Sequence, residues 1–203
     1  MKIICIGRNY VDHANELNNP IPEKPLIFMK PSTALLLDGK AFYYPDFSNN
    51  IHYELELVLK IKKNGRQIQP HFARDYFGQV GLGIDFTARD IQDQCKEKGH
   101  PWEIAKAFDN SAVLGDFRNI SEMNDVHSIK FQLLKNGTVV QTGDSKDLIF
   151  NFNYLIVYIS QFFTLNVGDL IYTGTPAGVG PITKGDLLEG MMDGQKILEC
   201  AVK

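Results

Sequence analysis

Two glutamates two residues apart are the first pair in this sequence whose type and spacing suit metal chemistry. Glu54 and Glu56 lie within residues 51–62, where the alternating pattern predicts a β-strand. Residues two apart on a strand project from one face with Cα atoms about 7 Å apart, so both carboxylates can reach one divalent cation. Their oxygens suit Mg²⁺, Mn²⁺ or Ca²⁺ rather than zinc. The alternative is an amphipathic strand with a solvated charged face, which this pair alone favours.

A third carboxylate, Asp85, stands at the end of an apolar stretch. Residues 80–86 predict a strand, and residues 88–98 predict the short helix that follows it. An aspartate at a strand end is a natural third metal ligand, and Arg89, one helical turn further on, can face a bound anion. Asp85 can equally cap the following helix, and the local sequence leaves both interpretations open.

His13 and Glu16 form a possible acid–base pair in a helix predicted over residues 10–18, which ends at Asn18-Asn19-Pro20. A spacing of three places both on one helix face, where Glu16 can orient the imidazole and raise its basicity. The pair can then activate water or carry a proton. A surface histidine with an incidental glutamate neighbour is the more common origin of such spacing.

Two further features could bind an anion. Lys106 is a lone lysine in an apolar stretch, where it can bind a carboxylate or stabilise an enolate, although most lysines extend to solvent. Residues 174–180 (GTPAGVG) offer backbone N–H groups but have neither the Lys-Ser/Thr of a P-loop nor the dinucleotide-binding pattern. The alternative for this segment is a tight loop.

The elements that must position these residues are mostly strands. Residues 1–6, 169–172 and 196–202 predict strands, and Asn136-Gly137 predicts a hairpin between residues 129–134 and 138–141. Residues 20–31 contain four prolines and predict a loop. Residues 147–163 predict the clearest helix, capped by Ser145 or Asp144. Because strands and helices do not alternate regularly, we expect an α+β fold with a dominant sheet.

Length and composition exclude several classes of protein. The chain has 203 residues, 44% of them hydrophobic, with a net charge of −3, which predicts one folded domain and no binding to nucleic acid. The longest apolar region, residues 148–165, is interrupted by polar side chains, so we expect no membrane association. Cys5, Cys95 and Cys200 are scattered, which indicates buried free thiols in a reducing compartment. With no targeting segment apparent at the start, we expect a cytoplasmic protein.

Five motifs in one order give a more specific indication. They are residues 5–13 (CIGRNYVDH), 25–32 (PLIFMKPS), 53–57 (YELEL), 85–90 (DFTARD) and 173–180 (TGTPAGVG). Together they resemble the fumarylacetoacetate hydrolase family over nearly the whole chain. Residues 88–106 (ARDIQDQCKEKGHPWEIAK) are most similar to its short acylpyruvase and oxaloacetate decarboxylase branch.

This resemblance implies a β-rich mixed β-roll with short flanking helices, a single catalytic domain over residues 1–203 with an N-terminal lid at about residues 8–20, and a homodimer. It also implies an Mg²⁺ or Mn²⁺ ion. The positions that match the family's functional residues are Glu54, Glu56 and Asp85 for the metal, His13, Glu16 and Lys106 for catalysis, and Arg89, Gln92, Lys106 and Thr175 for substrate binding.

The resemblance further implies an enzyme that acts on 2-oxo acids through a metal-stabilised enolate. Acylpyruvate C–C hydrolysis, oxaloacetate decarboxylation and tautomerisation all pass through such an enolate, so one site can serve each reaction. An alternative is a 2-hydroxyhepta-2,4-diene-1,7-dioate isomerase or hydratase of aromatic degradation. A non-enzymatic metal-binding protein is a further alternative, but it would not need Lys106, Arg89 and the His13–Glu16 pair.

Overall fold

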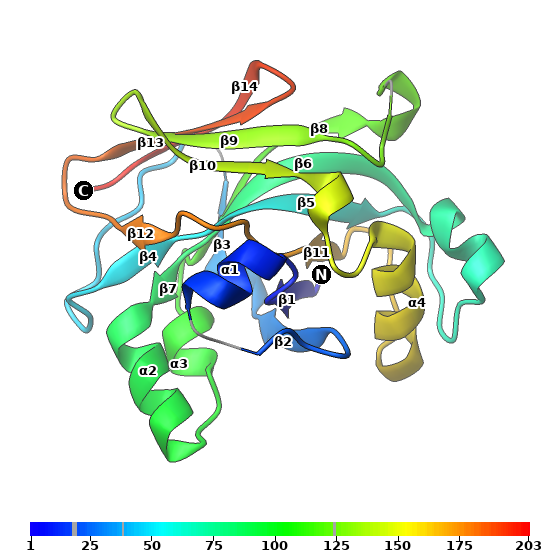
Figure 1. The fold of residues 1–203 in the computed structure, drawn as a ribbon, viewed down its shortest axis with the longest axis horizontal. Helices are drawn as coiled ribbons and strands as arrows, with labels where there is room; N and C mark the ends of the chain where they lie inside the picture. Colours follow the sequence, from blue (N-terminus) through cyan, green and yellow to red (C-terminus); the bar gives the residue numbers. More distant parts are fainter. Residues whose placement is uncertain (18–19, 38, 124) are drawn as a thin grey trace.

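The computed structural model describes residues 1–17, 20–37, 39–123 and 125–203, and it is rich in strands (Figure 1). The strands are β1 (Ile3–Gly7), β2 (Leu26–Lys30), β3 (Leu35–Leu37), β4 (Ile51–Tyr53), β5 (Leu55–Ile61), β6 (Phe77–Asp85), β7 (Thr87–Ala88), β8 (Ala112–Asn119), β9 (Lys130–Lys135), β10 (Thr138–Asp144), β11 (Leu170–Tyr172), β12 (Gly180–Pro181), β13 (Leu187–Met192) and β14 (Gln195–Ala201). The α-helices are α1 (Val11–Glu16), α2 (Arg89–Lys98), α3 (Glu103–Lys106) and α4 (Phe152–Phe162). Among the described helices, none has the length and apolar character needed to span a membrane.

The described residues form three sheets. A seven-stranded mixed sheet has the order β2-β1-β11-β5-β6-β8-β3, a four-stranded sheet has the order β10-β9-β13-β14, and a three-stranded sheet has the order β12-β4-β7. The four-stranded sheet lies across β5 and β6, whereas α1, α2 and α3 gather on the other side (Figure 1). This curled, β-rich arrangement with few helices confirms the predicted α+β class.

Strand β5 is buried on both faces. Leu55, Leu57 and Leu59 belong to the main core, together with residues of β9 and β13. Val58, on the opposite face, packs in a second apolar cluster with β1 and β11. Because Glu54, Glu56 and Val58 are all buried and Lys60 is the one exposed residue of β5, the interpretation of residues 51–62 as an amphipathic strand with a solvated charged face is wrong.

The predicted strand over residues 51–62 is broken at Glu54, which matters for the site. Before the break, β4 pairs with β7 and β12 in the small sheet; after it, β5 pairs with β6 and β11 in the large sheet. The chain makes the same transition at Phe86, between β6 and β7. The backbone N–H of Asp85 donates to the Glu54 carbonyl over 2.8 Å, so both transitions occur side by side.

Helix α4 begins later than predicted. The segment before it is used instead to fix the N-terminal region, because the N–H groups of Ile149 and Phe150 donate to the backbone and side-chain oxygens of Asn9. The N-cap is Asn151, whose side chain accepts from the Tyr154 N–H over 3.0 Å. A start at residue 147 with Ser145 or Asp144 as cap is therefore wrong; Asp144 caps only a short 3₁₀ turn over Ser145–Asp147.

Other predicted elements agree with the structure to different extents. Helix α2 and the hairpin of β9 and β10 are confirmed, and Asn136 and Gly137 have φ values of 53° and 78°, as the tight turn requires. Helix α1 covers less than the predicted residues 10–18, and the predicted stop at residues 18–19 lies outside the described residues. The segment predicted as a loop contains β2, an edge strand that pairs with β1.

Candidate active site

Three buried carboxylates meet where the chain changes sheets. Glu54 and Asp85 stand at the two transitions, and Glu56 follows on β5, one pleat along the same face. All three residues are buried, with exposed fractions of 5% for Glu54, 2% for Glu56 and 0% for Asp85. One oxygen from each lies within 4.8 Å of the others. The structure thus brings together the three residues predicted as metal ligands, although they come from two separate segments.

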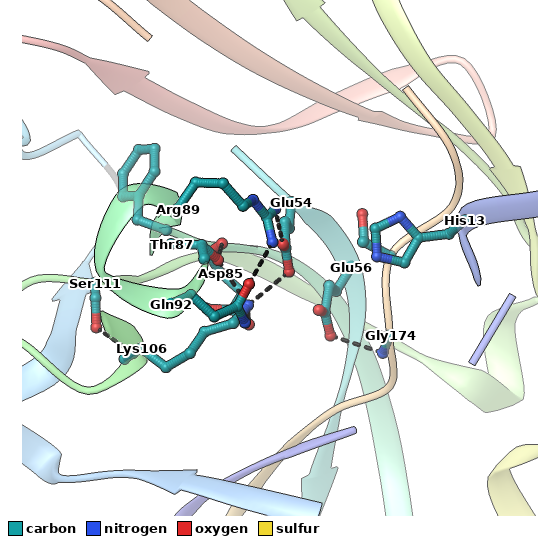
Figure 2. Close-up of polar contacts among 12 residues, drawn as sticks. His13, Glu54, Glu56, Asp85, Thr87, Arg89, Gln92, Lys106, Ser111 and Gly174 are labelled. Atoms are coloured by element: carbon teal, nitrogen blue, oxygen red, sulfur yellow. Dashed lines mark hydrogen bonds and ion pairs between the residues drawn. The ribbon is translucent and has the colours of Figure 1, made fainter. Parts of the chain in front are cut away.

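Lys106 connects two of the carboxylates. Its Nζ atom lies 2.7 Å from a Glu54 oxygen, 2.8 Å from an Asp85 oxygen and 2.6 Å from the Thr87 hydroxyl (Figure 2). Burial lowers the pKa of the Lys106 ammonium, but Asp85 and Glu54 outweigh this effect and raise it. Lys106 is therefore charged at neutral pH. Unlike most lysines, it does not extend to solvent.

Arg89 and Gln92 approach Glu54 from helix α2. The Arg89 guanidinium pairs with Glu54 and also donates to the Gln92 side-chain oxygen over 2.7 Å (Figure 2). Burial opposes ionisation of Glu54, yet Lys106 and Arg89 outweigh it and hold the pKa of this carboxyl well below its usual range. No side chain caps α2, so the interpretation of Asp85 as a helix cap is wrong.

Lys30 is a buried cation that the sequence analysis did not select. Its ammonium, on the last residue of β2, lies 2.8 Å from Asp85 and donates to the Lys106 carbonyl and to the Ser111 hydroxyl. Its side chain has no exposed surface. Lys30 therefore fixes one side of Asp85 and the backbone of Lys106 together.

Glu56 differs from the other two carboxylates because no cation pairs with it within the described residues. Its oxygen accepts from the Gly174 N–H over 2.7 Å, and Figure 2 shows it between the Arg89–Lys106 cluster and His13. Burial, together with the negative charges of Asp85 and Glu54, raises the pKa of the Glu56 carboxyl. Ionised Glu56 is thus the least compensated charge of the three, and an added cation would stabilise it.

The 174–180 loop does offer backbone N–H groups to anions, and these anions are carboxylates of the protein itself. Gly174 donates to Glu56, and the Gly178 N–H donates to both Glu16 oxygens over 3.0 and 3.2 Å. Gly174 has a φ of 103°, and a Cβ atom there would lie 2.6 Å from the Cβ of Asn9. Glycine is therefore required at this position.

His13 and Glu16 are adjacent on α1, as the spacing predicted. The His13 Nδ1 atom lies 3.3 Å from a Glu16 oxygen, and the exposed fraction of His13 is only 5%. Burial lowers the pKa of the imidazole despite the opposing effects of Glu54 and Glu16. Because an ionised carboxylate only accepts hydrogen bonds, the neutral imidazole carries its proton on Nδ1 and leaves Nε2 as a base.

One cavity is lined by nearly all the predicted site residues. Thr175 lines it as well, and its hydroxyl accepts from the buried Gln141 side chain over 2.8 Å. Glu16 reaches the cavity through His13. The predicted residues that line it directly are His13, Glu54, Glu56, Asp85, Arg89, Gln92, Lys106 and Thr175.

Several residues around this site were missed by sequence reasoning. Asn9 is fully buried and bonds to the Thr173 carbonyl, and Gln141 bonds to the Leu55 N–H as well as to Thr175. Both lie far along the chain from their partners. Asn9 belongs to a quoted motif, which was the available signal, whereas nothing local distinguishes Gln141.

Comparison with known proteins agrees with this geometry. An oxaloacetate tautomerase of Bos taurus, named FAHD1 and mitochondrial, is 41% identical over 192 residues, which are 95% of this chain and 87% of that protein. The oxaloacetate tautomerase YcgM of Escherichia coli K12 is 39% identical over 197 residues, covering 97% of this chain and 90% of the relative.

A solved structure gives a further match. The fumarylpyruvate hydrolase of Pseudomonas aeruginosa in complex with Mn²⁺ and pyruvate superimposes with a TM-score of 0.93 and 37% identity, over 100% of this chain and 89% of that one. The family model for the fumarylacetoacetate hydrolase C-terminal region matches residues 2–203. The resemblance inferred from the five motifs is thereby confirmed: the chain belongs to the fumarylacetoacetate hydrolase family.

Proposed function

We propose that this protein is a divalent-metal-dependent enzyme that interconverts the keto and enol forms of oxaloacetate, and that the same site can hydrolyse acylpyruvates. The observation that carries the proposal is the buried triad of Glu54, Glu56 and Asp85, which lies between charged lysine and arginine side chains and a neutral histidine. The names of the relatives support oxaloacetate tautomerisation as the first reaction, and the fumarylpyruvate hydrolase supports the second.

The triad fits an Mg²⁺ or Mn²⁺ ion. All three ligands are hard carboxylate oxygens, they are close enough to share one ion, and Glu56 has no cationic partner within the described part of the chain. When bound, such an ion supplies a Lewis acid that polarises the keto oxygen of a 2-oxo acid.

The chain's own residues would then carry the proton transfer. Lys106 and Arg89 place positive charge beside the substrate oxygens, where negative charge develops as the enolate forms. Nε2 of His13 accepts the proton from C3 of oxaloacetate, and Glu16 stabilises the imidazolium that results. Protonation of the enolate on oxygen gives the enol, and protonation on carbon returns the keto acid.

Hydrolysis of an acylpyruvate uses the same residues. Nε2 of His13 takes a proton from a water molecule, which attacks the distal carbonyl carbon. The C–C bond then breaks to give a carboxylic acid and a pyruvate enolate, which is protonated on carbon. Decarboxylation of oxaloacetate yields the same enolate with loss of CO₂. It is therefore a third reaction to assay, and it needs no separate site.

A stopped-flow assay of enol absorbance, coupled to malate dehydrogenase for the keto form, tests the proposal. The wild type with Mg²⁺ should accelerate tautomerisation, and His13→Gln should reduce kcat at least a hundredfold. The matched control is His127→Gln, at an exposed histidine that does not line the cavity. Acceleration that survives in His13→Gln would refute the role of the histidine.

A parallel panel separates the possible reactions. Oxaloacetate, acetylpyruvate and 2-hydroxyhepta-2,4-diene-1,7-dioate are each assayed with Mg²⁺. Turnover of the diene alone would replace the proposal with an isomerase or hydratase. Failure on all three, with a cation that still raises the melting temperature, would favour a non-enzymatic metal-binding protein.

We also propose that the protein acts as a homodimer in the cytoplasm, with the N-terminal segment at about residues 8–20 serving as a lid. Cys5 and Cys95 are buried thiols outside any disulfide, which suits a reducing compartment. Light scattering coupled to gel filtration should give twice the chain mass; a mass of one chain at micromolar concentration would contradict the dimer.

A further inference from the structure

Two cations that line the cavity have no role in the chemistry proposed above. Arg8 follows β1 and Lys96 lies in the last turns of α2, so they approach from different segments. Both residues are half-buried, in contrast to the fully buried Arg89 and Lys106. They therefore lie between the buried carboxylates and solvent.

Helix α2 presents one face to the cavity. Arg89, Gln92 and Lys96 all line it, and their spacing of three and four residues places them on the same side of the helix. Side chains on a helix lean toward its N-terminus, so Lys96 points back toward Gln92. Positive charge thus extends along this face of α2 from Arg89, which pairs with Glu54, to Lys96 near the opening of the cavity.

The charges of Arg8 and Lys96 are poorly compensated. Among the residues that the structure describes, Lys96 forms one ion pair, at 3.5 Å with the carboxylate of Asp93, whose side chain is 64% exposed. Arg8 has no ion pair within the described ranges, and its φ of 57° is rare for a residue with a side chain. Such a backbone conformation is often found where a side chain is held for function.

The two cations also affect one another. Burial lowers the pKa of the Lys96 ammonium, and the positive charges of Arg89 and Arg8 lower it further, although Asp93 acts in the opposite direction. An anion held between Arg8 and Lys96 would relieve this repulsion. Phe28 and Trp102, whose ring centroids lie 6.2 Å apart, give the same cavity an apolar part.

We propose that Arg8 and Lys96 form a subsite for the second carboxylate of a dicarboxylic 2-oxo acid. The subsite rests on the proposed function, in which the 2-oxo carboxylate end lies at the triad. A four-carbon acid such as oxaloacetate then gains two charge-assisted hydrogen bonds that a substrate with a neutral end lacks. The subsite therefore selects dicarboxylates over simple acylpyruvates.

The test is equilibrium binding, which does not depend on turnover. The probes are pyruvate and the difluorinated analogue of oxaloacetate, which has no C3 proton to lose, titrated calorimetrically into the Mg²⁺-loaded protein. The variants are Arg8→Gln and Lys96→Met, with Lys96→Arg as the conservative rescue. Lys98→Met is the matched control, because Lys98 is exposed on the same helix and does not line the cavity.

The wild type should bind the dicarboxylate more tightly than pyruvate. Each of Arg8→Gln and Lys96→Met should reduce this preference about tenfold to a hundredfold, while Lys96→Arg and Lys98→Met keep it. Because the preference is a ratio of two affinities, general damage to the fold affects both ligands and cannot imitate the result.

The unfavourable outcomes are distinguishable. A wild type that prefers the dicarboxylate, with the same preference in both variants, overturns the subsite and leaves the proposed function intact. A wild type that binds neither acid with Mg²⁺ overturns the proposed function and the subsite with it.

Discussion

Replacing Lys30 with methionine would keep most of the side-chain volume but remove a buried ammonium. In the wild type, this ammonium lies 2.8 Å from Asp85 and donates to the Lys106 carbonyl and to both oxygens of Ser111. The variant removes one donor from each of these buried acceptors, although the Lys106 carbonyl still accepts from the Ser111 hydroxyl and the Ser111 carbonyl from the Phe86 N–H. Removing one partner of a buried ion pair costs about 3–5 kcal/mol of unfolding free energy, a large part of the roughly 5–15 kcal/mol typical of a domain.

Urea unfolding followed by tryptophan fluorescence measures this loss directly. At about 2–4 °C per kcal/mol for a chain of this size, the melting temperature should fall by roughly 6–20 °C. Lys40→Met, at an exposed lysine, is the control and should change stability by less than about 0.5 kcal/mol. A loss below about 1 kcal/mol in Lys30→Met would refute the reasoning. Changing Asp85 to Asn in the same chain should recover part of the loss, because Asp85, which then keeps only Lys106 as a cationic partner among the described residues, no longer carries a charge.

Two further predictions concern the change in stability at acidic pH and the loop that follows β11. Burial raises the pKa of the Asp186 carboxyl, but hydrogen bonds from Thr183 and Asn136 outweigh it and lower this pKa in the folded protein. Ionised Asp186 therefore stabilises the fold fully above its unfolded pKa near 4, and this stabilisation is lost as the pH falls through the lower folded pKa. The stability difference between wild type and Asp186→Asn should be constant above about pH 5 and shrink below about pH 4; a difference that is unchanged at pH 3 would contradict this. Gly174→Ala should cost about 1–3 kcal/mol, because of its positive φ and the 2.6 Å approach to Asn9, and a melting temperature equal to the wild type would exclude that strain.

Much of the fold and the site was predictable because local patterns coincide with motifs. The alternation around Glu54 and Glu56 located a strand, and the spacing of His13 and Glu16 located a helix face that the structure confirms. The role of these residues in metal binding and catalysis stays a prediction. What the alternation could not show is that β5 is covered on both sides, since the covering strands β1, β9, β11 and β13 come from segments distant in the sequence.

The failures share one physical cause, which is contact between distant segments. Ile149 continues the helical pattern of α4, yet its backbone N–H, like that of Phe150, donates to Asn9, about 140 residues earlier. The proline-rich segment that predicted a loop supplies an edge strand, because β1 offers it a partner. Lys30 was overlooked for the same reason: its acceptors belong to segments at residues 85, 106 and 111.

The central claim is that Glu54, Glu56 and Asp85 hold one hard divalent cation. Anomalous diffraction from crystals grown with Mn²⁺ tests it most directly. The account predicts one strong peak about 2.0–2.6 Å from an oxygen of each carboxylate, and its loss in Glu56→Gln but not in the exposed control Glu97→Gln. No peak at saturating Mn²⁺, or a peak that contacts none of the three carboxylates, would contradict the account.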